Sequence, residues 1–154
     1  VLPESFIIGV RISPEIERIG IALDDSIKLC SILNDEGIDF IHLSCWNAFK
    51  GSISYRNNSK TLTEWFVTSL RNPPSIISTG KVWSHKDAQN LLNQGADLIG
   101  VGRAAIGHPD WASQVKNPNY DPAKPPFSVT ELRKAMLSDV FIDYMRNWEG
   151  FVCD

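Results

Sequence analysis

The sequence predicts an α/β fold, and within that class one (β/α)4 half of a (β/α)8 (TIM) barrel with parallel strands and a C-terminal helical extension. Short apolar runs alternate with helical patterns, which is typical of parallel sheets because each crossover returns the chain through a helix. Polarity also alternates within the runs, as in strands that have one covered face and one face bearing a site. The length of 154 residues suits half of a barrel, since a complete one needs about 250.

Four runs rich in Ile, Val, Leu or Phe are predicted to be strands: Phe6–Ser13, Ile38–Ser44, Ser75–Thr79 and Asp97–Gly102. In the first run, one side would carry Ile8, Val10 and Ile12, and the other Gly9, Arg11 and Ser13. In the second, Ile41 and Leu43 oppose His42 and Ser44. The small and polar side suits the mouth of a barrel better than a second apolar sheet face. A doubly wound open sheet of parallel strands is the alternative architecture.

Helix signals lie between and after these runs. The first helix is predicted to begin near Asp24-Asp25 and to end at Gly37, with an apolar stripe of Ile27, Cys30 and Leu33. The next two begin at the capping patterns Thr61-x-x-Glu64 and Ser84-x-x-Asp87. A single last helix is predicted from Ser128 to Trp148, after a Pro-rich surface connection over Asn117–Pro126. Two segments echo each other, Leu33–Ile41 and Leu92–Ile99, because in both a helix ends at Gly and an Asp opens the next strand.

Composition excludes several classes of function. With 43% hydrophobic and 21% charged residues, the chain is expected to be globular, and a net charge of −3 argues against a nucleic-acid surface built on positive charge. No apolar run approaches the roughly 20 residues that span a bilayer. The cysteines (Cys30, Cys45 and Cys153) form no C-x-x-C pair, so we expect a reducing, cytoplasmic setting and no metal site. The chain opens on Val1 rather than Met and shows no signal-peptide pattern, so we expect a fragment of a longer protein, with an engineered or processed start as the alternative.

The strongest chemical signal is the run Ile99–Ile106, in which a strand leads into Gly102 and Arg103. A glycine there lets an anion approach the backbone N–H groups, and the arginine adds a charge-assisted contact. Gly80 and Lys81 supply the matching loop after the preceding strand, as in barrels that hold phosphate between their last loops. Ala105 stands where a dinucleotide fingerprint needs its third glycine. A strand-ending turn with a solvated arginine is an equally weighted alternative.

Arg11 is the second signal, because an arginine within an apolar strand is costly unless it is paired. One interpretation is a structural ion pair, with Asp39 or Glu15 as the partner. The other is a cation that faces a ligand oxygen or a delocalised anion from the carboxyl end of the strand.

Several motifs in order resemble the C-terminal half of Old Yellow Enzyme-type flavin oxidoreductases: VRISPE, DFIHLS, STG, DAQNLL and GADLIGVGRAAIGHPDW, over Phe6–Trp111. The resemblance implies an FMN-binding barrel half over residues 1–116 and a loop with a helical extension over 117–154. It implies that Arg11 lies beside the N1–C2=O edge of the flavin. Gly80, Lys81, Gly102 and Arg103 would hold the FMN phosphate. Hydride would pass from NAD(P)H to FMN, and then to an activated alkene or another small-molecule acceptor.

The resemblance also implies what this chain lacks. In that family the substrate-orienting His/Asn or His/His pair and the proton-donating tyrosine belong to the N-terminal half of the barrel, so no catalytic residue is assigned here. We expect the missing half-barrel or another copy as a partner, and no NAD(P)H turnover by this chain alone. A non-catalytic half-barrel that binds phosphate or a partner, or a different phosphate-binding barrel enzyme, is the alternative.

The remaining histidines and the residues after the second strand are given structural roles. His42 is predicted to be a satisfied core residue, and His85 and His108 to lie on the surface or in loops. For Cys45 and Trp46, local packing is favoured over lining the mouth.

Overall fold

The computed structural model describes residue 3 and residues 5–154. Contacts divide the chain into two compact units, one of residues 1–81 and 89–100, the other of residues 82–88 and 101–154. The first contains β1 (Gly9–Ile12), η1 (Glu17–Ile19), α1 (Leu23–Asp35), β2 (Phe40–Ser44), α2 (Leu62–Ser69), β3 (Ser75–Thr79) and β4 (Leu98–Gly100). The helix α3 (His85–Asn93) runs from the second unit into the first. No helix in the described part of the chain is long and apolar enough to cross a bilayer.

The four strands β1 to β4 form one sheet in chain order, and every neighbouring pair is parallel. A doubly wound sheet reverses its strand order at a switch point, whereas sequential order is that of a barrel wall. The α/β half-barrel prediction is therefore confirmed. The strands are shorter than predicted at β1, β2 and β4, because the flanking residues leave the ladder.

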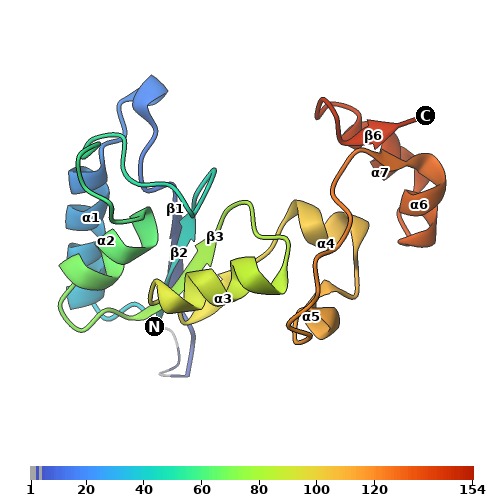
Figure 1. Ribbon diagram of the computed structural model, residues 1–154. Helices are drawn as coiled ribbons and strands as arrows, with labels where there is room; N and C mark the ends of the chain where they lie inside the picture. The colour runs from blue at the N-terminus through green and yellow to red at the C-terminus, as the bar shows by residue number, and fades with distance from the viewer. Residues whose placement is uncertain (1–2, 4) are drawn as a thin grey trace. The chain divides into compact units, whose positions relative to one another are not determined.

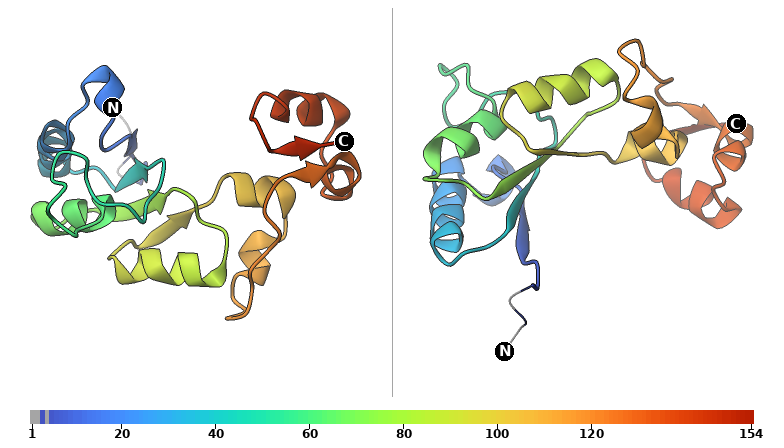
Figure 2. Two further views of the ribbon diagram at one scale, coloured as in Figure 1. Left: turned by 45° about the horizontal axis from the view of Figure 1, so that its top comes forward. Right: turned by 90° about the horizontal axis from the view of Figure 1, so that it is seen from below.

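The two sides of this sheet differ as the sequence predicts. One side is packed under helices: Ile41 and Leu43 are fully buried, and the buried Ser78 hydroxyl hydrogen-bonds Thr63 of α2 at 2.8 Å. Figures 1 and 2 show α1 and α2 together on one side of the strands. Arg11 pairs in register with His42, which belongs to the opposite, half-buried or exposed side. Leu98 on that side is 55% exposed.

The repeated Gly–Asp pattern forms the same pair of hydrogen bonds twice at the amino ends of the strands, and we call this pair the aspartate clamp. The Asp39 backbone N–H donates to the Ile8 carbonyl, while its Oδ2 accepts from the Ile8 N–H at 2.7 Å. Asp97 makes the same two bonds to Ile76, with its Oδ2 accepting at 2.8 Å. Each aspartate thus joins its own strand to the preceding one, which explains the echo in the sequence.

The second unit has a small core of its own. Its elements are α4 (Arg103–Gly107), α5 (Trp111–Gln114), β5 (Phe127–Ser128), α6 (Val129–Lys134), α7 (Asp139–Met145) and β6 (Val152–Cys153). Phe127, Leu132, Ile142 and Phe151 are buried. The buried Trp111 indole N–H donates to the Trp83 carbonyl at 2.6 Å. The parallel pair β5–β6 has only two residues in each strand, too short for an alternating pattern in the sequence.

The prediction of one long terminal helix was wrong, because the chain breaks it into α6 and α7. Met136 adopts a left-handed φ of 66°. The Met136 N–H bonds the Arg133 carbonyl, and the Leu137 N–H bonds the Leu132 carbonyl, which is the Schellman pattern of a helix end. Ser138 then caps a new helix by accepting from the Phe141 N–H. The left-handed position after a helix usually holds glycine. Because methionine stands there in this chain, the sequence does not indicate that the helix ends.

The predicted helix starts were correct. Thr61 and Ser128 each form a full capping box, with Glu64 and Glu131 respectively. Ser84 and Asp87 make the same reciprocal bonds at the start of α3. Residues 117–126 form an irregular connection, as predicted.

Candidate functional site

Arg11 lies near the carboxyl end of β1, where its side chain is exposed on the uncovered side of the sheet. Its Nη2 donates to the Ser44 hydroxyl of β2 at 2.6 Å. The ion-pair interpretation was wrong within the described residues: Glu15 accepts bonds from residues 52–54, and Asp39 binds the Ile8 N–H. A positive charge is therefore held by a neutral hydroxyl, and it keeps its capacity to attract an anion.

His42 lies on the same side of the sheet, one strand away from Arg11. Its Nε2 hydrogen-bonds the Thr79 hydroxyl at 2.7 Å. Burial, together with the charge of Arg11, lowers the pKa of His42 below its usual value. The ring has a polar partner, as predicted, but it is half-buried on the uncovered side rather than in the helix-covered core. A Cβ at Gly100 of β4 would collide with the Thr79 hydroxyl, so glycine makes room for this pair.

Gly80 and Lys81 follow β3 at the carboxyl edge of the first unit. Gly80 is buried with φ of 151°, and an added Cβ would lie 2.5 Å from the Cys45 carbonyl oxygen. The Ala48 N–H bonds the Gly80 carbonyl at 3.2 Å. Lys81 is exposed and has a left-handed φ of 57°, which is rare for a residue with a side chain and tends to occur at ligand sites.

Gly102 and Arg103 belong to the second unit, where they begin α4. Both are exposed, and a Cβ at Gly102 would meet nothing within 4 Å. Internal packing therefore gives no reason for glycine at this position, in contrast to Gly80. That these residues share one phosphate with Gly80 and Lys81 stays a prediction of the resemblance.

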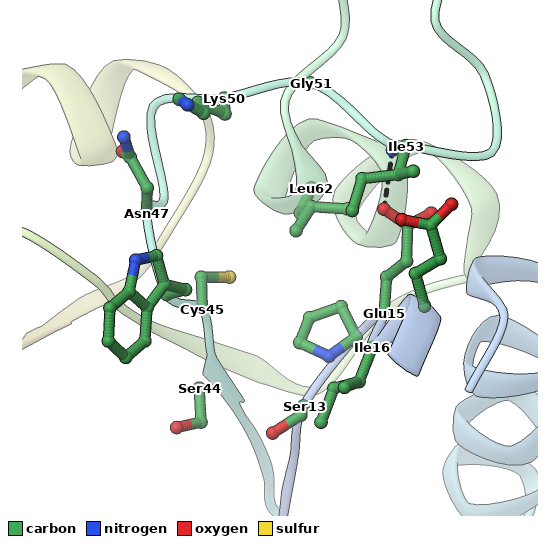
Figure 3. Close-up of a pocket in the computed structure, with 13 residues that line it drawn as sticks. Ser13, Glu15, Ile16, Ser44, Cys45, Asn47, Lys50, Gly51, Ile53 and Leu62 are labelled. Carbon is green, nitrogen blue, oxygen red and sulfur yellow. Dashed lines mark hydrogen bonds between the residues drawn. The ribbon is translucent and has the colours of Figure 1, made fainter. Parts of the chain in front are cut away.

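A pocket of about 640 Å³ opens beyond the carboxyl ends of β1 and β2 (Figure 3). One wall is the segment 13–17, and the other is the loop that leaves β2 at Ser44 and reaches Leu62 of α2. Cys45 and Trp46 both line this pocket, but Cys45 is also buried, as the packing interpretation predicts, whereas Trp46 is exposed. Cys45 is buried and burial raises its pKa to about 12, so the thiol stays protonated and serves as an apolar wall.

Glu15 fixes the far wall of this pocket. Its carboxylate accepts from the Ser52 hydroxyl at 2.6 Å, from the Ile53 N–H at 2.6 Å and from both donors of Ser54. Burial acts to raise the pKa of Glu15, but these hydrogen bonds outweigh it and hold the pKa below its usual value. The Glu15 carboxylate thus sets the position of the loop after β2.

The two remaining histidines hold the connection between α5 and β5. His85 begins α3, and its Nδ1 hydrogen-bonds the Val115 carbonyl at 2.7 Å. The Nε2 of His108 hydrogen-bonds the Ala123 carbonyl at 2.8 Å. Both are half-buried, so the expectation of surface positions was only partly correct. Among the described residues, no group of three or more His, Cys, Asp or Glu side chains could hold a metal ion.

Comparison with known proteins identifies relatives of one chemical type. The chain is 35% identical over 117 residues to an NADH:acrylate oxidoreductase of Vibrio harveyi and 37% identical over 117 residues to an NADH:fumarate oxidoreductase of Klebsiella pneumoniae. It is 24% identical over 149 residues to a probable NADH-dependent flavin oxidoreductase of Bacillus subtilis. The chain is a homologue of Old Yellow Enzyme-like NADH:flavin oxidoreductases. No protein-family model matches it.

These NADH-dependent relatives are much longer than the aligned segment. The alignments cover 73% of this chain but 12% of each of the first two proteins, and 96% of this chain but 40% of the third. The chain therefore corresponds to a part of each relative.

Sequence reasoning missed two features of the candidate site. Ser44 was noted only as a polar strand residue, but its hydroxyl holds the Arg11 guanidinium. The sequence contains no signal for the pocket, because its walls are joined by long-range contacts such as the bonds of Glu15 to a loop more than 30 residues away.

Proposed function

We propose that the intact protein is an FMN-dependent NAD(P)H oxidoreductase of the ene-reductase type, and that this chain supplies its phosphate-binding turns and a flavin-facing arginine. The observation that carries the proposal is the Arg11 guanidinium, held by Ser44 at the carboxyl edge of parallel strands. In barrel enzymes, the active site lies at that edge. All three relatives are named for NADH, and the Bacillus subtilis protein is also named for flavin, which supports the same chemistry.

The residues present fit a flavin. When bound, FMN accepts hydride from a nicotinamide donor and passes it to an acceptor. Arg11 would place a fixed positive charge where negative charge develops on the reduced ring. The Ser44 bond holds that charge in position before the reaction, and His42 beside it has its pKa lowered by burial and by Arg11.

For the phosphate end, we propose Gly80, Lys81, Gly102 and Arg103 as ligands. Lys81 has a left-handed backbone and an exposed ammonium group. Gly102 has open space where a side chain would stand, which allows an anion to approach the backbone. The backbone of Lys81 supports a phosphate contact at the turn after β3, and the open space at Gly102 supports one at the turn before α4. We propose that both turns bind the same FMN phosphate.

The acceptor is proposed to be a small molecule, and the catalytic acid is proposed to come from the rest of the protein. Two relatives are named for reduction of acrylate and fumarate, which are activated alkenes. The uncovered side of the sheet, with Leu98 largely exposed, supports pairing with the missing half-barrel or with another copy.

The test is the reduction potential of the flavin in the purified full-length protein and in its Arg11→Met variant. Loss of the guanidinium should make the bound flavin harder to reduce and should lower kcat/KM for NADH by about 10²-fold. Arg18→Met, which removes another exposed arginine of the same unit, should change neither quantity. A full-length protein without flavin, or an unchanged potential in Arg11→Met, would overturn the proposal.

A further inference from the structure

We propose that the pocket between residues 13–17 and the loop after β2 binds the adenosine diphosphate part of NADH, with the adenine against Trp46 and the diphosphate near Lys50. The inference rests on the proposed function, and it assigns a ligand to a pocket for which the sequence motifs suggest none. It identifies the surface of this chain that would bind the part of NADH other than the nicotinamide ring.

The pocket is next to the proposed site of hydride transfer. Ser44 lines the pocket and also holds the Arg11 guanidinium at 2.6 Å. Ser13, which lines it too, follows Arg11 closely in the chain. A dinucleotide whose nicotinamide lies at the flavin would therefore meet this pocket as it leaves the carboxyl edge of the sheet.

The lining suits an aromatic heterocycle with an attached anion. Ile16, Ile53 and Leu62 form an apolar surface, and Trp46 contributes an indole that is 82% exposed. Nucleobases gain binding energy by stacking on such exposed rings. Figure 3 shows Asn47 and Lys50 at one end of the pocket and Ile53 at the other. Lys50 is exposed and would place a cation beside a phosphate.

Glu15 keeps its negative charge, but it lies at the Ile53 end of the pocket, whereas the diphosphate is proposed beside Lys50 at the other end (Figure 3). Glu15 is turned toward the loop by its hydrogen bonds to residues 52–54. Glu17 pairs with Arg56 at 3.8 Å. The bonds of Glu15 also hold the wall in place before binding, which lowers the entropic cost of ordering it.

The size of the pocket favours the donor over the acceptor. A volume of about 640 Å³ is that of a site for a ligand of drug size, far larger than a small carboxylate requires. The relatives named for acrylate and for fumarate differ in acceptor, but their names share NADH, and both align with this chain at similar identity. The size of the pocket therefore suits the NADH that both names share better than the small acceptors in which they differ.

The direct test is calorimetric titration of the full-length protein with ADP-ribose, which lacks the nicotinamide and needs no flavin reaction. We expect saturable binding that weakens by about tenfold in Trp46→Ala and much less in Trp46→Phe, because the ring remains in the latter. Lys50→Met should also weaken binding. Trp148→Ala, which removes an indole of the other unit, is the matched control and should bind like wild type.

The kinetic arm compares NADH with N-benzyl-dihydronicotinamide, a hydride donor without the adenosine diphosphate part. Trp46→Ala should raise KM for NADH about tenfold and leave turnover of the truncated donor unchanged. No binding of ADP-ribose by wild type, or equal losses with both donors, would overturn the pocket assignment. If the protein oxidises neither donor, the proposed function fails, and the ADP-ribose titration still decides the pocket.

Discussion

At the scale of single residues, two glycines assigned to the same phosphate have opposite surroundings. A Cβ at Gly80 would lie 2.5 Å from the Cys45 carbonyl oxygen and 2.9 Å from the Ala48 nitrogen, whereas a Cβ at Gly102 would meet nothing within 4 Å. Gly80 therefore has a packing role whether or not it binds phosphate. Gly102 has no such internal role among the described contacts.

This contrast predicts different effects of the same substitution. Gly80→Ala should lower the free energy of unfolding by about 2 kcal/mol or more, because it adds both a clash and a strained positive φ. Gly102→Ala should change stability by less than about 0.5 kcal/mol and act only on phosphate or FMN affinity. Urea unfolding of the two full-length variants measures this difference, and equal destabilisation would contradict it.

Glu15 predicts how the loop after β2 responds to acid. Because hydrogen bonds hold its pKa below the usual value, its stabilising contribution is complete above the unfolded-state pKa, near 4.5. The contribution should disappear as the pH falls through the lower, folded-state pKa. Amide exchange at Ile53 and Ser54 should therefore accelerate in that acidic range, beyond the intrinsic pH effect.

Glu15→Gln is the matched variant for this experiment, since the amide keeps the size of the side chain but does not titrate over this range. Its loop should already exchange faster at neutral pH, with no added acid transition. An acid transition of the same size in Glu15→Gln would show that another group is responsible.

At the scale of elements, the aspartates Asp39 and Asp97 join adjacent strands where they begin. Asp97→Ala should destabilise the protein by about 1–3 kcal/mol, because it leaves the N–H of the buried Ile76 without its carboxylate acceptor. Asp121→Ala, in the exposed connection before β5, is the control and should have little effect. Thermal unfolding of the full-length variants distinguishes them, and equal midpoints would argue against the clamp.

The turn between α6 and α7 predicts a stabilising substitution. Met136 is 88% exposed and holds a left-handed φ of 66° where glycine is usual. Met136→Gly should raise the free energy of unfolding by about 0.5–1 kcal/mol, since relief of strain exceeds the entropy that glycine adds to the unfolded chain. Met136→Ala keeps the Cβ and should give no such gain, so similar values for both variants would contradict the explanation.

These elements also show how far the sequence predicts the fold. The strands, their order and the helix starts follow from apolar runs and from paired capping residues such as Thr61 and Glu64, because those signals are local. The helix break at Met136 does not, since a methionine stands where the helix-ending signal is usually a glycine. The bond between Arg11 and Ser44 also depends on strand register, which a single sequence does not specify.

At the scale of the whole molecule, the chain holds one side of a proposed active site. Parallel strands bring Arg11, Ser44 and Thr79 to one edge, and the pocket opens from that edge. The relatives extend well beyond the aligned segment, which matches the proposal that the catalytic acid lies elsewhere in the protein.

The most direct test of the account is anaerobic titration of the purified full-length protein with NADH, followed by the visible absorbance of its bound flavin. The account predicts a protein that is yellow as purified, contains FMN and loses its visible band in proportion to the NADH added. Release of the flavin by denaturation identifies it as FMN or FAD. A colourless protein, or a flavin band that NADH does not bleach, would contradict the account.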